Sequence, residues 1–175
     1  MSNVSHRSTA RLRLRPPNRS DLDFIIDLFS RPELVVHRPD PTPDTSEASR
    51  ARLMRDVDHW DVHGFGRWAV ESDGRLIGFG GLTFPKIDLP GLNVSYHLDP
   101  SAWGRGYASE LIREVALVGF EDLDADRLIG LVRAANPASR RVLEKAGFRT
   151  EGEVVLYGAP TELMTLRRSP TKLSA

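Results

Sequence analysis

The chain has no cysteine among its 175 residues, and this absence removes several kinds of chemistry at once. Disulfide frameworks, thiolate metal sites and covalent catalysis through a cysteine are excluded. No apolar run approaches the roughly 18 residues that a membrane-spanning helix needs. The basic first residues have no apolar segment behind them, as a secretory signal would. A cytoplasmic protein with no membrane partner and no metal is therefore expected.

The chain also lacks a surplus of either charge. Its 24 Lys and Arg residues balance its 24 Asp and Glu residues, so the formal net charge is zero. Proteins that bind nucleic acid usually carry a basic surplus, so no nucleic-acid partner is expected. Hydrophobic residues make up 40% of the chain and charged residues 27%, which is ordinary for one globular domain of this length.

The hydrophobic pattern predicts a mixed α/β (α+β) domain over residues 9–168, with flexible termini at 1–8 and 169–175. Alternation or short apolar runs predict strands at 11–15, 67–71, 75–83, 92–98, 127–132, 148–156 and 161–166. Apolar residues at helical spacing predict helices after Ser20, from 44 or 45 to 62, from 104 to 122, and from Asn136 to Gly147. The strand–helix–strand unit between 92 and 132 should form a parallel crossover, while hairpins should make their own strands antiparallel.

Local signals predict several helix ends and one tight turn. Ser20 is a candidate N-cap for the first helix, which Pro32 ends. Asn136 before Pro137 is a good pair for a helix start, with the asparagine as cap and the proline in the first turn. Asp73-Gly74 is the strongest short signal of a β-hairpin.

A glycine-rich segment, Trp103-Gly-Arg-Gly-Tyr-Ala-Ser109, lies between a predicted strand and a predicted amphipathic helix. The first N–H groups of a helix have no partner within it, and the aligned peptide dipoles leave partial positive charge there. Glycines let an anion approach the backbone closely, and Arg105 adds a charged donor. These features predict a phosphate or pyrophosphate site; the alternative is a glycine-rich turn that binds nothing.

Two other phosphate-binding motifs do not fit this segment. A P-loop needs Gly-x-x-x-x-Gly-Lys followed by Ser or Thr, which is absent. A dinucleotide-binding fold needs a third glycine where this chain has Ser109, and an acidic residue near the end of the next strand, where it has Arg133. Both nucleotide interpretations are excluded.

Longer segments resemble the motifs of one enzyme family. Ser95-Tyr-His-Leu-Asp-Pro-Ser-Ala-Trp-Gly-Arg-Gly-Tyr-Ala-Ser-Glu110 resembles the coenzyme-A motif of the GNAT acetyltransferases. Asn136-Pro-Ala-Ser-Arg-Arg-Val-Leu-Glu-Lys-Ala-Gly-Phe148 resembles the second motif of the ribosomal-protein N-terminal acetyltransferase-like (RimJ/RimL-type) branch, and Arg11-Leu-Arg-Leu-Arg-Pro16 resembles its opening strand. The resemblance implies a mixed, mostly antiparallel sheet with one splayed parallel strand pair, flanked by about four helices.

The same resemblance implies acetyl-CoA as the cosubstrate. Backbone amides from Gly104 to Ser109 would hold its diphosphate, and the pantetheine arm would lie between the splayed strands, along Tyr96 to Leu98. A backbone N–H there would bind the thioester oxygen and stabilise oxyanion charge. The residues implied in cofactor binding are Tyr96, His97, Leu98, Trp103, Gly104, Arg105, Gly106, Tyr107, Ala108, Ser109, Asn136 and Ser139. Many relatives have Gln or Arg in place of Trp103.

Ser139 is the one candidate catalytic side chain, because the RimJ/RimL-type branch places a serine close to the thioester sulfur. It would protonate the leaving thiolate directly or through water. Many other relatives use a tyrosine four residues further on, where this chain has Leu143. The alternative is that no side chain protonates the sulfur, since a thiolate with a pKa of ~8.5 is a tolerable leaving group.

The base that deprotonates the amine is not identified by the sequence. Many relatives carry a carboxylate on the strand before the cofactor loop, where this chain has Asn93 and Ser95. The candidates are His97, Asp99, Glu71, His37 and His59.

The sequence thus predicts an acetyltransferase that moves an acetyl group to a primary amine of a small molecule or of a peptide or protein N-terminus, by direct attack in a ternary complex. Two alternatives stay open: a degenerate GNAT domain that binds acyl-CoA as a sensor or scaffold without turnover, and an enzyme for a longer acyl-CoA. The first two helices, the loops at 36–43 and 85–91, and the last hairpin would set the acceptor. Loops of this kind vary freely. A homodimer is the commonest assembly and stays an option.

Overall fold

The computed structural model describes residues 4–169, and within them eight strands form one sheet in the order β1-β2-β3-β4-β5-β6-β8-β7. The strands are β1 (Arg7–Ser8), β2 (Arg13–Arg15), β3 (Arg67–Ser72), β4 (Arg75–Thr83), β5 (Leu92–Leu98), β6 (Arg127–Val132), β7 (Arg149–Leu156) and β8 (Ala159–Arg167). The α-helices are α1 (Leu22–Ser30), α2 (Pro32–Val35), α3 (Ser46–His63), α4 (Tyr107–Leu117) and α5 (Pro137–Lys145). Short 3-10 turns at Arg19–Asp21 and Pro100–Ala102 and a π-helical turn at Val118–Asp122 complete the secondary structure of this region.

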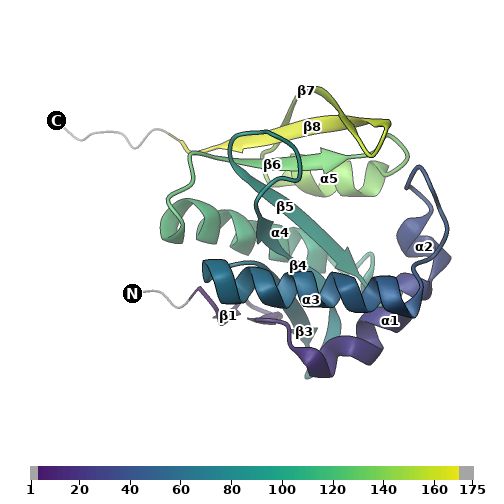
Figure 1. Cartoon of the computed structure of the whole chain (residues 1–175). Coiled ribbons are helices and arrows are strands. Elements are labelled where there is room, and N and C mark those ends of the chain that lie inside the picture. The colour runs from purple at the N-terminus through teal and green to yellow at the C-terminus, as the bar shows by residue number, and fades with distance from the viewer. Residues whose placement is uncertain (1–3, 170–175) are drawn as a thin grey trace.

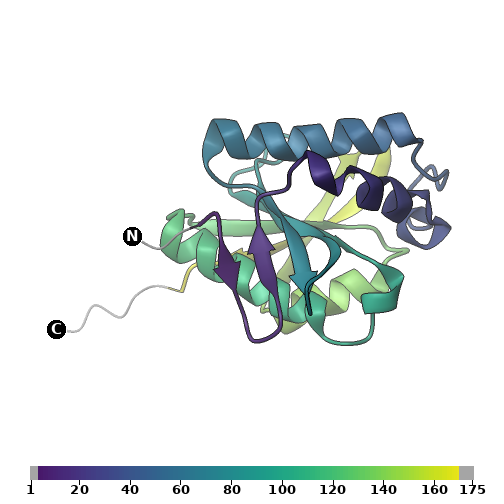
Figure 2. The same ribbon diagram turned by 90° about the horizontal axis from the view of Figure 1, so that it is seen from below.

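The sheet lies between two layers of helices. Helices α1 and α3 cover one face, and α4 and α5 cover the other (Figure 1; Figure 2). On the first face, Phe29 of α1 and Leu53 of α3 pack with Phe79 of β4. On the second face, Leu111 of α4 packs with Leu128 of β6 in the larger core cluster. The predicted mixed α/β class is confirmed.

The two central strands are parallel for only part of their length. Strand β5 pairs with β6 at Leu92, Asn93 and Val94, whereas its other edge stays paired with β4 as far as Leu98. The remainder of β5 therefore has a free edge, and a wedge opens between it and β6. This confirms the predicted splayed pair and the predicted crossover, which passes through α4.

Two predicted helix starts are wrong in detail. Asn18, not Ser20, is the cap of the first helical turn: its side chain accepts a hydrogen bond from the Ser20 N–H at 2.8 Å, and Asp21 completes a capping box. The helix predicted from 104 begins only at Tyr107, because Gly104 and Gly106 have φ of +71° and +80°, which an α-helix cannot contain.

The start of the domain is also earlier than predicted. Arg7 and Ser8 pair with β2, and the Trp68 indole donates a hydrogen bond to the Val4 carbonyl at 3.1 Å, so the expectation of a flexible segment through residue 8 is wrong for these residues. The rest of the predicted flexible termini, 1–3 and 170–175, lies outside the described residues. Between residues 4 and 169, none of the helices has both the length and the apolar composition to cross a membrane.

Candidate active site

A cavity of about 510 Å³ lies at the wedge. Its walls come from α2 with the residues after it, from the end of β5, from the loop that leads into α4, and from the first turns of α5. All of the residues predicted to bind the cofactor line it except Arg105, whose guanidinium lies over the Tyr107 ring, 5.2 Å from its centroid. The structure therefore brings together segments that are spread over residues 33–145 of the sequence.

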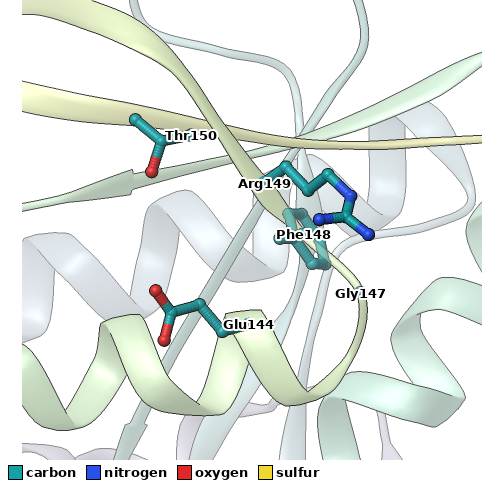
Figure 3. A pocket seen from close by; sticks show the side chains of 5 residues that line it. All are labelled: Glu144, Gly147, Phe148, Arg149 and Thr150. Atoms are coloured by element: carbon teal, nitrogen blue, oxygen red, sulfur yellow. The ribbon is translucent and has the colours of Figure 1, made fainter.

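A second hollow, of about 340 Å³, lies elsewhere, where α5 ends and β7 begins (Figure 3). It is lined by Glu144, Gly147, Phe148, Arg149 and Thr150. In Figure 3 the carboxylate of Glu144 and the guanidinium of Arg149 point apart, so the two charged groups do not converge on one ligand position. The cavity at the wedge is the candidate site.

The loop before α4 presents a row of unpaired backbone donors. In the described part of the chain, no acceptor receives a hydrogen bond from the N–H groups of residues 104–109. The first N–H of this region with a helical partner is that of Glu110, which donates to the Gly106 carbonyl at 3.1 Å. With the helix dipole behind them, these donors form the kind of site that binds a phosphate group.

Side chains on the far side of this loop hold it in place. The Arg11 guanidinium donates to the Arg105 carbonyl at 2.8 Å and to the Glu110 carboxylate at 2.7 Å, and it lies over the Tyr107 ring. The Tyr107 ring is buried, and its hydroxyl accepts a hydrogen bond from Ser72 at 3.2 Å. This role of Arg11 could not be predicted from the sequence, where Arg11 is only part of a strand, because the contact joins residues 94 positions apart.

The free edge of β5 offers a second set of backbone groups. The Asp99 N–H donates to Ile77 of the β4 side at 2.7 Å, so by alternation the N–H and C=O groups of Tyr96 and Leu98 face the wedge. The Trp103 indole occupies one of them, donating to the Leu98 carbonyl at 2.8 Å. The Leu98 N–H and both backbone groups of Tyr96 are left facing the cavity.

The start of α5 supplies polar side chains to the same wedge. The Asn136 side chain accepts from the Ser139 N–H at 3.2 Å, which confirms its predicted capping role. The Ser139 side chain lies near the hydroxyl of Tyr96 across the wedge, close enough to act on the pKa of the phenol as a hydrogen-bond donor. Burial raises the pKa of Tyr96, and the hydrogen bond from Ser139 offsets part of that rise, so the phenol stays protonated at neutral pH. The sequence predicts a role only for the backbone of Tyr96, and this pair of hydroxyl groups was not predicted.

Of the five candidate bases, only His97 and His37 line the cavity. The other three are held elsewhere by contacts of their own. Glu71 pairs with Arg15 at 2.7 Å, Asp99 caps the turn at Ser101, and the His59 ring contacts the Phe65 carbonyl.

The two cavity histidines differ in their hydrogen bonds. The His97 Nδ1 lies 2.9 Å from an Arg67 nitrogen, and because a guanidinium can only donate, Nδ1 accepts and the ring proton sits on Nε2. Burial first, and then the Arg67 charge, hold the pKa of His97 well below its usual value. Burial and the charges of Arg38 and Arg133 also lower the pKa of His37, but its ring has no hydrogen bond within residues 4–169. His97 is thus a fixed donor, whereas His37 is free to accept a proton.

The comparison with family models decides which enzyme family has this geometry. The model of the GNAT acetyltransferase domain matches residues 11–149, which is most of the chain. The chain belongs to the GNAT acetyltransferase family. Within that family it is an N-acetyltransferase that depends on acetyl-CoA, and the cavity at its wedge is the candidate site for both substrates.

Individual relatives agree with this assignment. The FsC-acetyl coenzyme A-N(2)-transacetylase of Aspergillus fumigatus is 30% identical over 147 residues, which are 79% of this GNAT chain and 63% of that enzyme, so the chain spans less than two thirds of its length. An acetyltransferase structure from Agrobacterium tumefaciens superposes with a TM-score of 0.82 at 22% identity, covering 96% of this chain and 97% of that one.

A ribosomal-protein-S5-alanine acetyltransferase from Vibrio fischeri has a similar structure, with a TM-score of 0.72 at 20% identity, covering 93% of this chain and 96% of that one. At such identities both structures show that the fold is shared, and the RimJ/RimL-type branch stays a resemblance in sequence motifs.

Proposed function

We propose that this chain transfers the acetyl group of acetyl-CoA to the primary amine of a small molecule or of a peptide or protein N-terminus, by direct attack within a ternary complex. The observation that carries the proposal is the row of unpaired N–H groups at 104–109, which opens onto the same cavity as the free edge of β5. A diphosphate and a pantetheine arm need these two sets of donors at adjacent positions.

The residues that would hold the donor follow from this arrangement. The N–H groups of Gly104 to Ser109 would bind the diphosphate, and the left-handed glycines keep that surface free of side chains: a Cβ added at Gly104 would meet no atom within 4 Å. The Leu98 N–H and the backbone groups of Tyr96 would pair with the pantetheine arm and the thioester oxygen. A donor aimed at that oxygen stabilises the negative charge that develops as the amine attacks.

Two groups would move the protons. His37 is neutral at neutral pH because its pKa is lowered, so it can accept the proton of the attacking amine, directly or through water. The neighbouring hydroxyls of Ser139 and Tyr96 both belong to residues that line the cavity, and we assign to them, acting together, the supply of a proton to the leaving thiolate. Because no covalent enzyme intermediate is needed, this scheme suits a chain without cysteine.

A titration followed by thermal unfolding tests donor binding. Acetyl-CoA and free coenzyme A at ~100 times their dissociation constants should each add about 2.7 kcal/mol of stability, and NAD should add none. Thiol release with pooled amines then tests turnover. Stabilisation without thiol release on any amine would contradict the proposed transfer and favour an acyl-CoA sensor, and faster release from longer acyl-CoA donors would correct the acyl group.

A further inference from the structure

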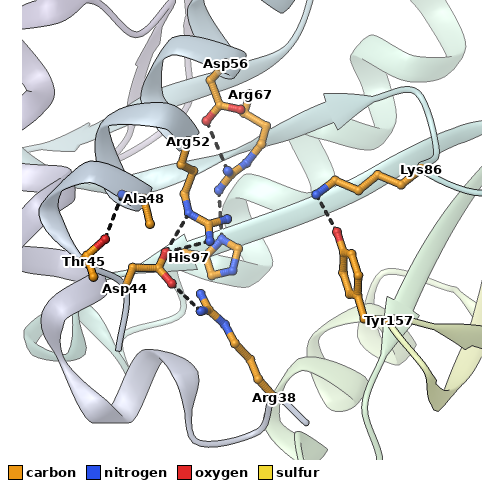
Figure 4. A network of polar contacts seen from close by, with 10 residues as sticks. All are labelled: Arg38, Asp44, Thr45, Ala48, Arg52, Asp56, Arg67, Lys86, His97 and Tyr157. Atoms are coloured by element: carbon orange, nitrogen blue, oxygen red, sulfur yellow. Dashed lines mark hydrogen bonds and ion pairs between the residues drawn. The ribbon is translucent and has the colours of Figure 1, made fainter. Parts of the chain in front are cut away.

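A cluster of arginines surrounds the ring of His97 on the face of the sheet that α1 and α3 cover. Arg38, Arg52 and Arg67 each bring a guanidinium to this cluster, and within residues 4–169 the carboxylates that pair with them are Asp44 and Asp56 (Figure 4). The five charged side chains therefore leave one positive charge in excess. His97 itself is neutral and does not add to the balance.

The arginines are locked into position by these pairings. Arg38 and Arg52 both donate to Asp44, at 2.7 Å and 2.8 Å, and the Arg52 guanidinium stacks over the Phe29 ring at 4.2 Å. The ring of Phe29 in turn packs edge-on against His97, with 5.0 Å between ring centroids. Both arginines keep about a fifth to a quarter of their side chains exposed, so their charge acts on the space beside His97 as well as on Asp44.

Arg67 is buried beneath this group and faces His97 directly. One guanidinium nitrogen lies 3.2 Å from the Asp56 carboxylate, and the other lies 2.9 Å from the His97 Nδ1. This contact turns the Nε2–H of His97 into a fixed donor. Within residues 4–169, no acceptor takes a hydrogen bond from that Nε2–H. The nitrogen is nevertheless not fully buried, so the N–H faces the cavity that His97 lines.

The rest of the cavity has little negative charge with which to hold a cationic acceptor. Its charged lining residues are Glu33 and Lys145, one of each sign. The positive charges of Arg38 and Arg133 also act on its second histidine, His37, and lower the pKa of that ring. An acceptor with several ammonium groups would meet a positive potential here, whereas a carboxylate would meet a donor and an excess positive charge.

Resting on the proposed function, we propose that the acceptor is an amine that carries a carboxylate within a few bonds, as an α-amino acid does. The His97 Nε2–H would receive this carboxylate, and the excess positive charge of the arginine cluster behind it would attract it. The same positive charge favours the neutral form of the acceptor amine, which is the form that attacks. Polyamines and other polycationic amines are therefore poor acceptors.

Matched acceptors test this inference on the wild-type enzyme. The panel is an α-amino acid, its primary amide, the alkylamine that has neither carboxylate nor amide, and spermidine. Thiol release is followed for each amine over a range of pH. Rates are compared per neutral amine, because the four amines have different pKa values. We expect kcat/KM for the carboxylate to exceed that for the amide at least about tenfold, with spermidine lowest. An amide or a polyamine that serves as well as the carboxylate would overturn the inference.

Charge variants identify the source of the preference. Arg38→Gln and Arg52→Gln should each reduce the ratio of kcat/KM for carboxylate over amide about three- to tenfold, mainly through KM for the acceptor, with KM for acetyl-CoA unchanged. Arg167→Gln is the control, because it removes the same charge from an exposed residue of β8 that pairs with Glu151. An unchanged ratio in both variants, or an equal change in the control, would contradict the assignment.

Different results would refute the proposed function and the carboxylate preference. Loss of the acetyl-CoA response, or no thiol release with any amine, would refute the proposed function. Normal turnover of amide or polyamine acceptors would leave that function standing and refute only the carboxylate.

Discussion

The two sides of β5 are built by different means. On the side of α4 and α5, the site consists of backbone N–H groups that two left-handed glycines expose, together with a helix start. On the side of α1 and α3, it consists of long charged side chains that pair across elements far apart in the sequence, such as Arg67 with Asp56 and His97. The first kind of site has a local sequence signature, and the second kind has none. A variant on one of these two faces of the sheet should therefore change one kind of site and leave the other intact.

The largest expected effect is on the backbone site. Gly104→Val should weaken acetyl-CoA binding about 1000-fold, because its side chain would stand where the diphosphate lies and two or more charge-assisted hydrogen bonds of roughly 2 kcal/mol each would be lost. Isothermal titration of the folded variant measures this.

Gly64→Val is the matched control for that variant. Gly64 also has a φ of +71° and also has no atom within 4 Å of an added Cβ, but it lies at the end of α3 and outside the cavity. Both variants should lose similar stability to backbone strain. Equal losses of affinity in the two variants would mean that backbone strain, and not a side chain placed among the N–H groups of residues 104–109, controls binding.

Near the site of the attacking amine, His37→Gln should lower kcat about 100-fold, since a glutamine is polar and similar in size but cannot take the proton from the amine. Binding of acetyl-CoA, followed by thermal shift, should not change. A variant that turns over at the wild-type rate at every pH would remove His37 as the base and leave proton transfer to water.

A smaller effect is expected at the hydroxyl pair. Ser139→Ala and Tyr96→Phe should each lower kcat about tenfold, because a thiolate leaves without a proton only somewhat more slowly. The double variant should cost little more than either single one, since the two hydroxyls act as a unit. Additive losses would show that they act separately.

The smallest effect concerns stability against pH. Because the folded pKa of His97 lies well below that of the unfolded chain, near 6.5, the stability that the neutral ring contributes is present above that value and is lost as the pH falls below it. His97→Asn should therefore flatten the fall in the free energy of unfolding between about pH 6.5 and 5, by at most ~1.4 kcal/mol per pH unit. Urea unfolding at several pH values measures the slope, and identical slopes would contradict the buried neutral ring.

The regular elements and the backbone site could be predicted because their causes are local. Strict alternation marks β5 at 92–98 as observed, and Asp73-Gly74 marks the turn between β3 and β4, where both residues have positive φ. The four-residue helix α2 is too short to show a hydrophobic period, so its contribution to the cavity went unpredicted.

The acceptor side could not be predicted because its residues are common types with distant partners. Nothing in the sequence separates Arg67, which is only 6% exposed, from the chain's many surface arginines. The hydroxyl contact between Tyr96 and Ser139 depends on how far the strands splay, which no motif specifies. Arg11 similarly supports the cofactor loop through a contact that only the fold creates.

The central claim is that the main-chain donors at the start of α4 hold the diphosphate of the acetyl donor. Amide NMR of the ¹⁵N-labelled chain, titrated with coenzyme A and separately with pantetheine, tests this most directly. Coenzyme A should shift the amide signals of residues 104–109 strongly, whereas pantetheine, which has no diphosphate, should move those of Tyr96 and Leu98 and leave 104–109 in place. Amide signals at 104–109 that do not respond to saturating coenzyme A would contradict the account.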